Sequence, residues 1–355
     1  MADDDWKTGL QGDDVTLRFH DRSFVFDALS LYYVIEEPYA ERLLTGGVNA
    51  TNVTFAIEEE WDDVLGHVDR SIEAIEKSPL MTLATTHDEL LAAKAAGKLG
   101  IVMGTQGASM LGRDPILEEA SDGSGLKPRF DRLEQFHEMG LRSLGLSYTA
   151  ANVFADGCGE ARDAGLSFLG QDLVACVNEL NLLLDLSHTG HQSRAEAASL
   201  ARAPVCTHSN AYALVPNDRN TKDETVKAIA AKGGMMGIVA FPGFIADEDP
   251  TVPGMVDHMD HFIDLVGEEH VGIGTDFTEA YQDKKVVLPE SRRWRTRRPD
   301  MFGSVDDFLK LKYPLPTIRL LPNLTQAMFD RGYSEERIGA ILGGNWLRAF
   351  KEFVG

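Results

Sequence analysis

Two histidines and one aspartate stand at the ends of short apolar runs, where a parallel sheet places its catalytic groups. His188 ends LLLDLSH, His208 ends APVCTH and Asp276 ends HVGIGTD. Neutral imidazole nitrogens and carboxylate oxygens are common zinc ligands, and a catalytic zinc keeps one position open for water. The three chain positions therefore predict a metal site, with Asp276 as a ligand or as a general base. For each histidine taken alone, a purely structural role is the alternative.

Further polar residues follow or interrupt other apolar runs. Gln106 follows LGIVMGT, and Tyr148 and then Asn152 follow LRSLGLS. Arg219 lies in VPNDRNTKDE, ahead of a helical segment, where its guanidinium could bind a substrate carboxylate or equally pair with a surface acid. Asp185 lies inside a predicted buried strand, so its carboxylate needs a hydrogen-bond donor, which we expect to be a loop amide.

Eight strand-like runs alternate along the chain with segments of helical period. Segments such as 61–77 and 87–98 carry apolar residues at three- and four-residue steps, which predicts helices. The alternation predicts an α/β fold, a parallel (β/α)₈ barrel with its catalytic groups at the carboxyl ends of the strands. A doubly wound open sheet is the rival fold, but no glycine-rich nucleotide motif follows any run. The strand-like runs are 24–29, 48–55, 99–105, 141–148, 182–188, 203–208, 234–241 and 270–276.

Two segments lie outside this alternation. Residues 1–24 predict a short N-terminal extension, in which VTLRFHD pairs as a strand with FVFDAL, and residues 25–355 predict a single barrel. Residues 286–314 hold five arginines, at positions 292, 293, 295, 297 and 298, in an otherwise acidic chain. The simplest interpretation of this segment is a solvated loop, and a lid or a subunit contact is the alternative.

The overall composition excludes several classes of partner. The 355 residues carry a formal net charge of −22, which repels polyanions, so we expect no nucleic acid and no anionic membrane as partner. The acidic start resembles no secretory signal, and no run approaches the roughly 20 apolar residues that span a bilayer. Three cysteines without a C-x-x-C spacing predict a reduced, cytoplasmic protein.

Several motifs in the same order resemble the membrane (renal) dipeptidase family of zinc peptidases. They are LLLDLSHTG, APVCTHSNAYAL, DRNTKDETVKAIAAKGGMMGIVAF, DHMDHFIDLVGEEHVGIGTDF and LGGNWLRAF, and the likeness extends over about residues 22–355. The resemblance implies a (β/α)₈ barrel, two zinc ions, cleavage of dipeptides and a homodimer. His188 and His208 match two zinc ligands of the family, Arg219 matches its substrate-carboxylate arginine, and Asp276 its catalytic aspartate. Asn152 matches the asparagine after the fourth strand, which we take as a substrate contact.

The chain departs from the family pattern at the other half of the metal centre. Leu29 and Leu31 occupy the places of an H-x-D pair that holds one zinc, and Gln106 replaces the glutamate that bridges both ions. Tyr148 replaces the histidine that polarises the scissile carbonyl. Leucine has no ligand atom, so these departures from the family pattern predict one zinc ion rather than the two that the resemblance implies.

Three hypotheses follow for the function. The first is a dipeptidase-like hydrolase that acts on an amide-type bond of a small, carboxylate-bearing substrate. In it His188, His208 and the Gln106 oxygen hold one zinc, Asp276 manages protons, and Tyr148 binds the substrate and polarises its carbonyl. The second is a non-hydrolytic enzyme, such as a lyase, isomerase or tailoring enzyme, that uses the same pocket. The third is a binding protein without turnover.

Overall fold

The computed structural model describes residues 5–112, 116–119, 123, 125–246 and 248–355. Eight parallel strands close into a barrel, because β1 pairs with β11 on one side and with β2 on the other, and β2 pairs in turn with β4. The barrel strands are β1 (Phe26–Leu31), β2 (Ala50–Thr54), β4 (Leu99–Gly104), β7 (Leu141–Gly145), β8 (Leu183–Asp185), β9 (Pro204–Cys206), β10 (Met235–Ile238) and β11 (Val271–Ile273). All eight predicted strands are present, and the predicted (β/α)₈ barrel is confirmed.

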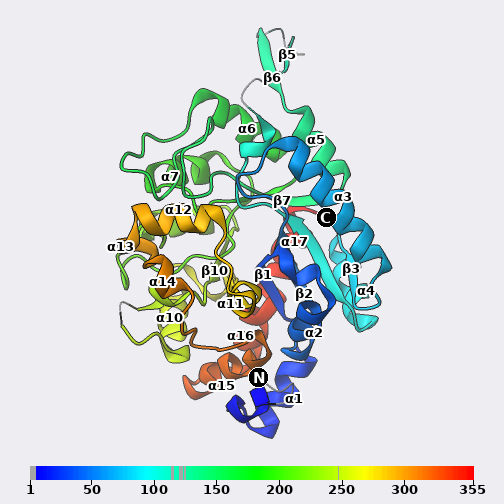
Figure 1. Ribbon diagram of the computed structural model, residues 1–355, viewed down its shortest axis with the longest axis vertical. Helices are drawn as coiled ribbons and strands as arrows, with labels where there is room; N and C mark the ends of the chain where they lie inside the picture. Colours follow the sequence, from blue (N-terminus) through cyan, green and yellow to red (C-terminus); the bar gives the residue numbers. More distant parts are fainter. Residues whose placement is uncertain (1–4, 113–115, 120–122, 124, 247) are drawn as a thin grey trace.

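Helices between successive strands cover the outside of the barrel (Figure 1). These helices carry their buried residues on one stripe, as at Val64, Val68 and Ile75 of α3. The α-helices are α1 (Asp14–Arg22), α2 (Glu37–Thr45), α3 (Trp61–Lys77), α4 (His87–Ala95), α5 (Asp131–Glu138), α6 (Phe168–Glu179), α7 (His191–Leu200), α8 (Asp223–Ala230), α9 (Pro242–Ile245), α10 (Val252–Val266), α11 (Glu279–Lys284), α12 (Pro289–Arg297), α13 (Pro299–Phe302), α14 (Val305–Phe308), α15 (Pro322–Asp330), α16 (Glu335–Gly339) and α17 (Asn345–Phe353). Short 3₁₀ turns span Asp5–Gly9, Tyr32–Ile35, Ser109–Leu111, Glu268–His270 and Ile318–Leu320, and one π turn spans Ala340–Gly344.

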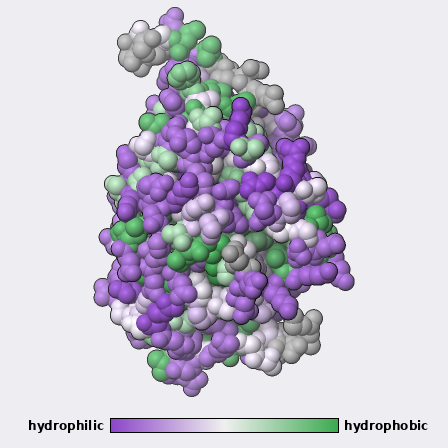
Figure 2. Space-filling view, turned by 90° about the vertical axis from the view of Figure 1, so that its left-hand side faces the viewer, coloured by the Kyte–Doolittle hydropathy of each residue, from purple (hydrophilic) through white to green (hydrophobic). Residues whose placement is uncertain are grey.

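Three further strands lie outside the closed barrel. β3 (Met81–Leu83) pairs with the outer side of β4, and β5 (Ile116–Glu119) forms an antiparallel hairpin with β6 (Leu126–Arg129). The hairpin projects from one end of the molecule (Figure 1). Figure 2 shows that hydrophilic side chains cover most of the face seen there and that apolar groups lie in small separate patches, in keeping with the net charge of −22. Among the described residues, none of the helices has the length and apolar character needed to span a bilayer.

The predicted N-terminal strand pair is wrong, because VTLRFHD forms helix α1. Asp13 caps this helix by accepting a hydrogen bond from the Thr16 amide at 2.7 Å. Thr16, Phe19 and His20 are its buried residues, a three- and four-residue spacing that suits a helix better than a strand. His20 Nδ1 lies 2.7 Å from the Thr325 hydroxyl of α15, so this segment packs against the C-terminal part of the chain. FVFDAL provides the first barrel strand instead.

The interpretation of the arginine-rich segment as a solvated loop is also wrong. The segment folds into α12, α13 and α14, which bury Trp294, Arg295, Met301 and Phe308. Trp294, Arg295 and Phe308 line a pocket together with residues from the ends of the barrel strands. We call residues 288–308 the covering segment, because its residues form one wall of that pocket. Figure 1 shows its helices α12, α13 and α14 one after another along one side of the molecule.

Candidate active site

A pocket at the carboxyl ends of the strands holds most of the predicted site residues. It contains about 670 Å³ of space, part of it open to solvent. Gln106, Tyr148, His188 and Asp276 line it, as the shared rim of a parallel barrel predicts. The other lining residues are Leu31, Ile57, Thr149, Phe241, Phe244, Thr278, Tyr281, Leu288, Ser291, Trp294, Arg295, Phe302 and Phe308.

The two predicted histidines lie side by side. Their Nε2 atoms are 3.1 Å apart, and both rings are buried. Burial lowers the pKa of each imidazole well below its usual range, and the nearby Arg219 guanidinium lowers both pKa values further. Both rings are therefore neutral near pH 7, which is the form in which histidine binds metals.

A buried hydroxyl fixes the tautomer of His208. Asp185 accepts hydrogen bonds from the amides of Ser187 and Thr207, both at 3.0 Å, and from their hydroxyls at 2.6 and 2.5 Å. Because the Thr207 hydroxyl gives its only proton to Asp185, it must accept at its 2.7 Å contact with His208 Nδ1. His208 thus carries its proton on Nδ1 and directs a lone pair from Nε2 toward His188. The predicted amide donors of Asp185 are present, and two hydroxyls add to them.

Thr149 occupies the corresponding place on the other ring. Its hydroxyl lies 2.9 Å from His188 Nδ1, and its backbone has φ of 61°, which a β-branched residue rarely adopts. Tyr148 packs its ring against His188, with centroids 4.1 Å apart. Burial, followed by the charge of Asp276, raises the pKa of the Tyr148 phenol well above its usual range, so the hydroxyl stays protonated and can donate a hydrogen bond.

Asp276 is a carboxylate in a largely apolar pocket. Its backbone has φ of 53°, a left-handed conformation that aspartate tolerates and that turns the chain at the end of β11. Burial raises the pKa of Asp276 to about 7. The positive charge of Arg219 lowers this pKa, the carboxyl group of Asp27 raises it, and the positive charge of Arg295 lowers it. A carboxyl group with that pKa can accept and return a proton near neutral pH.

Arg219 is fully buried and is not among the residues that line the pocket. Its Nη1 donates to the Ser187 carbonyl at 2.7 Å, its guanidinium lies 5.5 Å from the Phe244 ring, and its Nε and Nη2 atoms have no hydrogen-bond partner among the described residues. In the described part of the chain, no acidic residue forms an ion pair with Arg219. The structure therefore gives no support to the alternative that Arg219 pairs with a surface acid.

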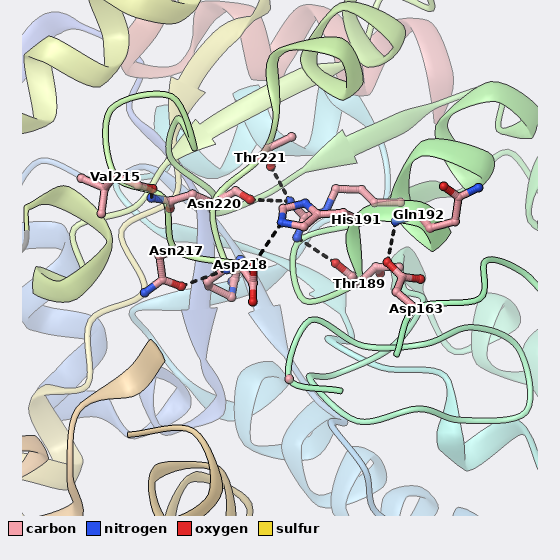
Figure 3. Close-up of polar contacts among 12 residues, drawn as sticks. Asp163, Thr189, His191, Gln192, Val215, Asn217, Asp218, Asn220 and Thr221 are labelled. Atoms are coloured by element: carbon pink, nitrogen blue, oxygen red, sulfur yellow. Dashed lines mark hydrogen bonds and ion pairs between the residues drawn. The ribbon is translucent and has the colours of Figure 1, made fainter. Parts of the chain in front are cut away.

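A second buried arginine holds the loop that carries Arg219. Arg194 of α7 donates to the Asn220 carbonyl at 3.1 Å, to the Thr221 hydroxyl at 2.7 Å and to the Thr189 carbonyl at 2.8 Å. Figure 3 shows Asn220 and Thr221 facing Thr189 across this contact. These bonds join the start of α7 to the loop that carries Arg219. They hold the backbone of Arg219 in place, in addition to the hydrogen bond that its own side chain forms.

Gln106 and Asn152 both use part of their amide groups for structural contacts. Gln106 Nε2 donates to Thr54 Oγ1 at 2.8 Å, which leaves its oxygen for other partners. A Cβ at Gly145 would lie 2.3 Å from the Gln106 carbonyl carbon, so this close approach requires glycine. Asn152 donates to the Leu146 carbonyl at 2.9 Å and accepts from the Phe154 amide at 2.8 Å, and it is not among the lining residues, so its predicted substrate contact stays a prediction.

The covering segment is joined to the Arg219 loop by an ion pair. Arg298 Nη2 lies 3.1 Å from Asp218 Oδ2, and the other Asp218 oxygen lies 3.4 Å from His191 Nε2, a contact drawn in Figure 3. Sequence patterns did not identify Arg295, Thr149 or Thr207 as site residues. The concentration of arginines in one segment was the only available signal for Arg295.

The described residues contain no group of three histidine, cysteine, aspartate or glutamate side chains that could hold a metal. His188 and His208 have two ring nitrogens that could bind a metal. A third protein ligand would have to come from another residue type, and Gln106, which lines the pocket, carries an amide oxygen of that kind.

Comparisons with known proteins agree with the motifs. The model of the membrane dipeptidase family (peptidase family M19) matches residues 40–286. A Claviceps purpurea protein named dipeptidase tcpJ is 27% identical over 281 residues, 78% of this chain and 56% of that protein. Dipeptidase aclJ of Aspergillus oryzae is 31% identical over 222 residues, 61% of this chain and 46% of that protein. The chain thus spans about half the length of these two fungal relatives.

A solved structure matches over nearly its whole length. It is described as an amidohydrolase from Pseudomonas aeruginosa, is 27% identical, and superposes with a TM-score of 0.81 over 96% of this chain and 99% of its own.

Proposed function

The chain belongs to the membrane dipeptidase family, peptidase family M19, and from this premise we propose that it hydrolyses an amide-type bond in a small, dipeptide-like substrate that carries a carboxylate. The observation that carries the proposal is a pair of neutral imidazoles with Nε2 atoms 3.1 Å apart. His188 lines the pocket together with Asp276 and Tyr148, and His208 lies buried behind it, outside the lining. The two Nε2 atoms face each other at a distance that suits a shared metal ion or a hydrogen bond between the rings.

The donor atoms fit one zinc ion. Two nitrogens that bind a tetrahedral zinc at about 2.0–2.1 Å lie about 3.3–3.4 Å apart, close to the 3.1 Å between His188 and His208. Their Nδ1 atoms contact Thr149 and Thr207, an outer shell typical of metal-binding histidines. The Gln106 oxygen is our candidate for the third protein ligand. A bound zinc would polarise the scissile carbonyl and acidify a water molecule.

A second ion of the family type does not fit. Leu29 and Leu31, at the places of the H-x-D pair, are buried apolar residues of β1. Neither has an atom that could bind a cation, and the neutral Gln106 amide cannot offset the charge of two ions.

Three side chains would act on the substrate. The Asp276 carboxylate, with its pKa near 7, would accept a proton from the attacking water and return it to the leaving amine. The Tyr148 hydroxyl would donate a hydrogen bond to the developing oxyanion. The two unpartnered guanidinium nitrogens of Arg219 would donate to the substrate carboxylate.

The test is metal content combined with hydrolysis. The purified full chain and His188→Ala are measured by elemental analysis and assayed against a dipeptide panel with and without a chelator. We expect about one zinc per chain, lost in the variant, together with hydrolysis that chelation abolishes. Two ions per chain, or hydrolysis that survives chelation, would contradict the proposal.

One observation favours a second candidate, ligand binding without turnover. With its proton on Nε2, His188 would donate to His208 Nε2 and accept from the Thr149 hydroxyl, so the pair can satisfy itself without a metal. Under this alternative the pocket binds a dipeptide-like ligand, and zinc supplied in excess changes neither binding nor turnover.

A further inference from the structure

Arg295 of α12 is a buried cation on the wall of the pocket. Its residue is 4% exposed, and its guanidinium lies 4.3 Å from the Phe308 ring centroid and 5.6 Å from that of Phe241. Its Nε donates to Ser291 Oγ at 3.0 Å and its Nη1 to the Phe302 carbonyl. Both bonds lie within the covering segment, and in the described part of the chain no hydrogen bond is formed by Nη2.

Asp307 and Asp276 act on this cation through space, and neither carboxylate forms an ion pair with it. Among the described residues Arg295 forms no ion pair, and Asp276 is the only acidic residue that lines the pocket. A guanidinium taken out of water without a counter-ion is costly, so this environment favours an anion in the pocket.

Arg219 provides a second positive charge behind the same pocket. It is fully buried and has two unpartnered nitrogens. Within a chain of net charge −22, the pocket region therefore holds two buried guanidinium groups that form no ion pair among the described residues, beside one lining carboxyl group, Asp276. One carboxylate on the ligand would compensate only one of them.

We propose that Arg295 is a second anion anchor and that the preferred substrates are dicarboxylates, small amides with one carboxylate for Arg219 and another for Arg295. This inference rests on the proposed function, because it assigns the carboxylate of that substrate to Arg219. Phe241 contacts Arg295, Phe244 contacts Arg219, and the two rings pack against each other between the anchors, where they offer apolar surface to the ligand's carbon chain. Because Arg295 belongs to the covering segment, a ligand held by both arginines links that segment to the barrel rim.

The test compares two ligands that differ by one carboxylate. N-acetyl-L-glutamate and N-acetyl-L-glutamine are titrated into the full chain at pH 7.5 and followed by calorimetry. We expect wild type to bind the glutamate derivative at least about tenfold more tightly, the scale of one charge-assisted pair. Arg295→Met keeps an unbranched apolar chain between Phe241 and Phe308 and should bind both ligands equally.

Arg297→Met is the matched control. It removes an exposed arginine of the same helix that does not line the pocket, so the preference for the glutamate derivative should remain. Should Arg295→Met fail to fold by circular dichroism, Arg295→Gln takes its place with the same expectation. Equal binding of the two ligands by wild type, or a preference that persists without Arg295, would overturn the inference.

The binding test is independent of turnover. A preference that depends on Arg295 in a protein without hydrolytic activity would leave the anion anchor standing and remove the proposed function. Hydrolysis of neutral dipeptides with no such preference would leave the proposed function standing and remove the anion anchor.

Discussion

Asp276→Asn should stabilise the metal-free protein at alkaline pH while it removes activity. Burial in the pocket raises the pKa of this carboxyl group from an ordinary 3.8 to about 7. The folded protein therefore keeps a proton that the unfolded chain releases between those two pH values. Because the folded state binds more protons in this window, stability falls as pH rises through it and levels off above about pH 7.

The size of the effect follows from the two pKa values. A difference of one pKa unit corresponds to about 1.4 kcal/mol, so the interval from 3.8 to about 7 gives at most about 4 kcal/mol. About 3 kcal/mol of this falls between pH 5 and pH 9. At about 2.1 cal/mol/K of unfolding entropy per residue, 3 kcal/mol shifts Tm by roughly 4 °C in a chain of this length. Asparagine carries no titrating proton, so the variant lacks this loss.

The assay is urea denaturation of chelator-treated wild type and Asp276→Asn at several pH values from 5 to 9. From pH 5 to pH 9, the free energy of unfolding of the variant relative to that of wild type should rise by about 3 kcal/mol. Asp27, whose pKa burial raises to about 6, titrates in the same window in both proteins, so only its coupling to Asp276 enters the difference. A stability difference that is constant from pH 5 to pH 9 would refute the argument that burial holds the Asp276 proton.

Three other substitutions test the supporting structure. Tyr148→Phe removes only a hydroxyl and should lower kcat by about 10²-fold with little change in KM, as steady-state kinetics would measure. Asp185→Ala leaves two buried amides and two hydroxyls without their acceptor and should lower the free energy of unfolding by roughly 3–5 kcal/mol in urea titrations. Gly145→Ala places a Cβ 2.3 Å from the Gln106 backbone. It should lower the free energy of unfolding by about 1–3 kcal/mol, measured by denaturation, and weaken zinc binding, measured by metal titration. Unchanged values would mean that the rim adapts to the added Cβ.

The barrel and its rim were predictable because they depend on local patterns. Each barrel strand is a short apolar run, and parallel strands bring their carboxyl ends together whatever the details of packing. Gln106, Tyr148, His188 and Asp276 thus meet at one pocket as expected. The hydroxyl that fixes His208 was not predictable, because the register of β8 and β9, with Asp185 opposite Val205, is what brings Thr207 near Asp185.

The two wrong predictions have a common physical cause. In VTLRFHD the apolar letters alternate, which suits a strand, but Thr16, Phe19 and His20 also form a helical stripe, and α15 offers a surface for that stripe. In the covering segment, charge suggested solvent, yet Phe241 and Phe308 cover the guanidinium of Arg295. In both cases tertiary packing selects between local alternatives.

The replacements in the metal centre are consistent with each other in charge. Relative to the family pattern, Leu31 removes one carboxylate, Gln106 removes a second, and Leu29 removes a neutral ligand. Loss of one divalent cation removes two positive charges, so these changes leave the net charge of the site as it was. Loss of both ions would leave the rim two charges more negative than the family pattern. The set of replacements therefore favours one ion, and Gln106→Glu alone, which adds an uncompensated charge to a buried rim, should destabilise the single-ion protein rather than restore a second site.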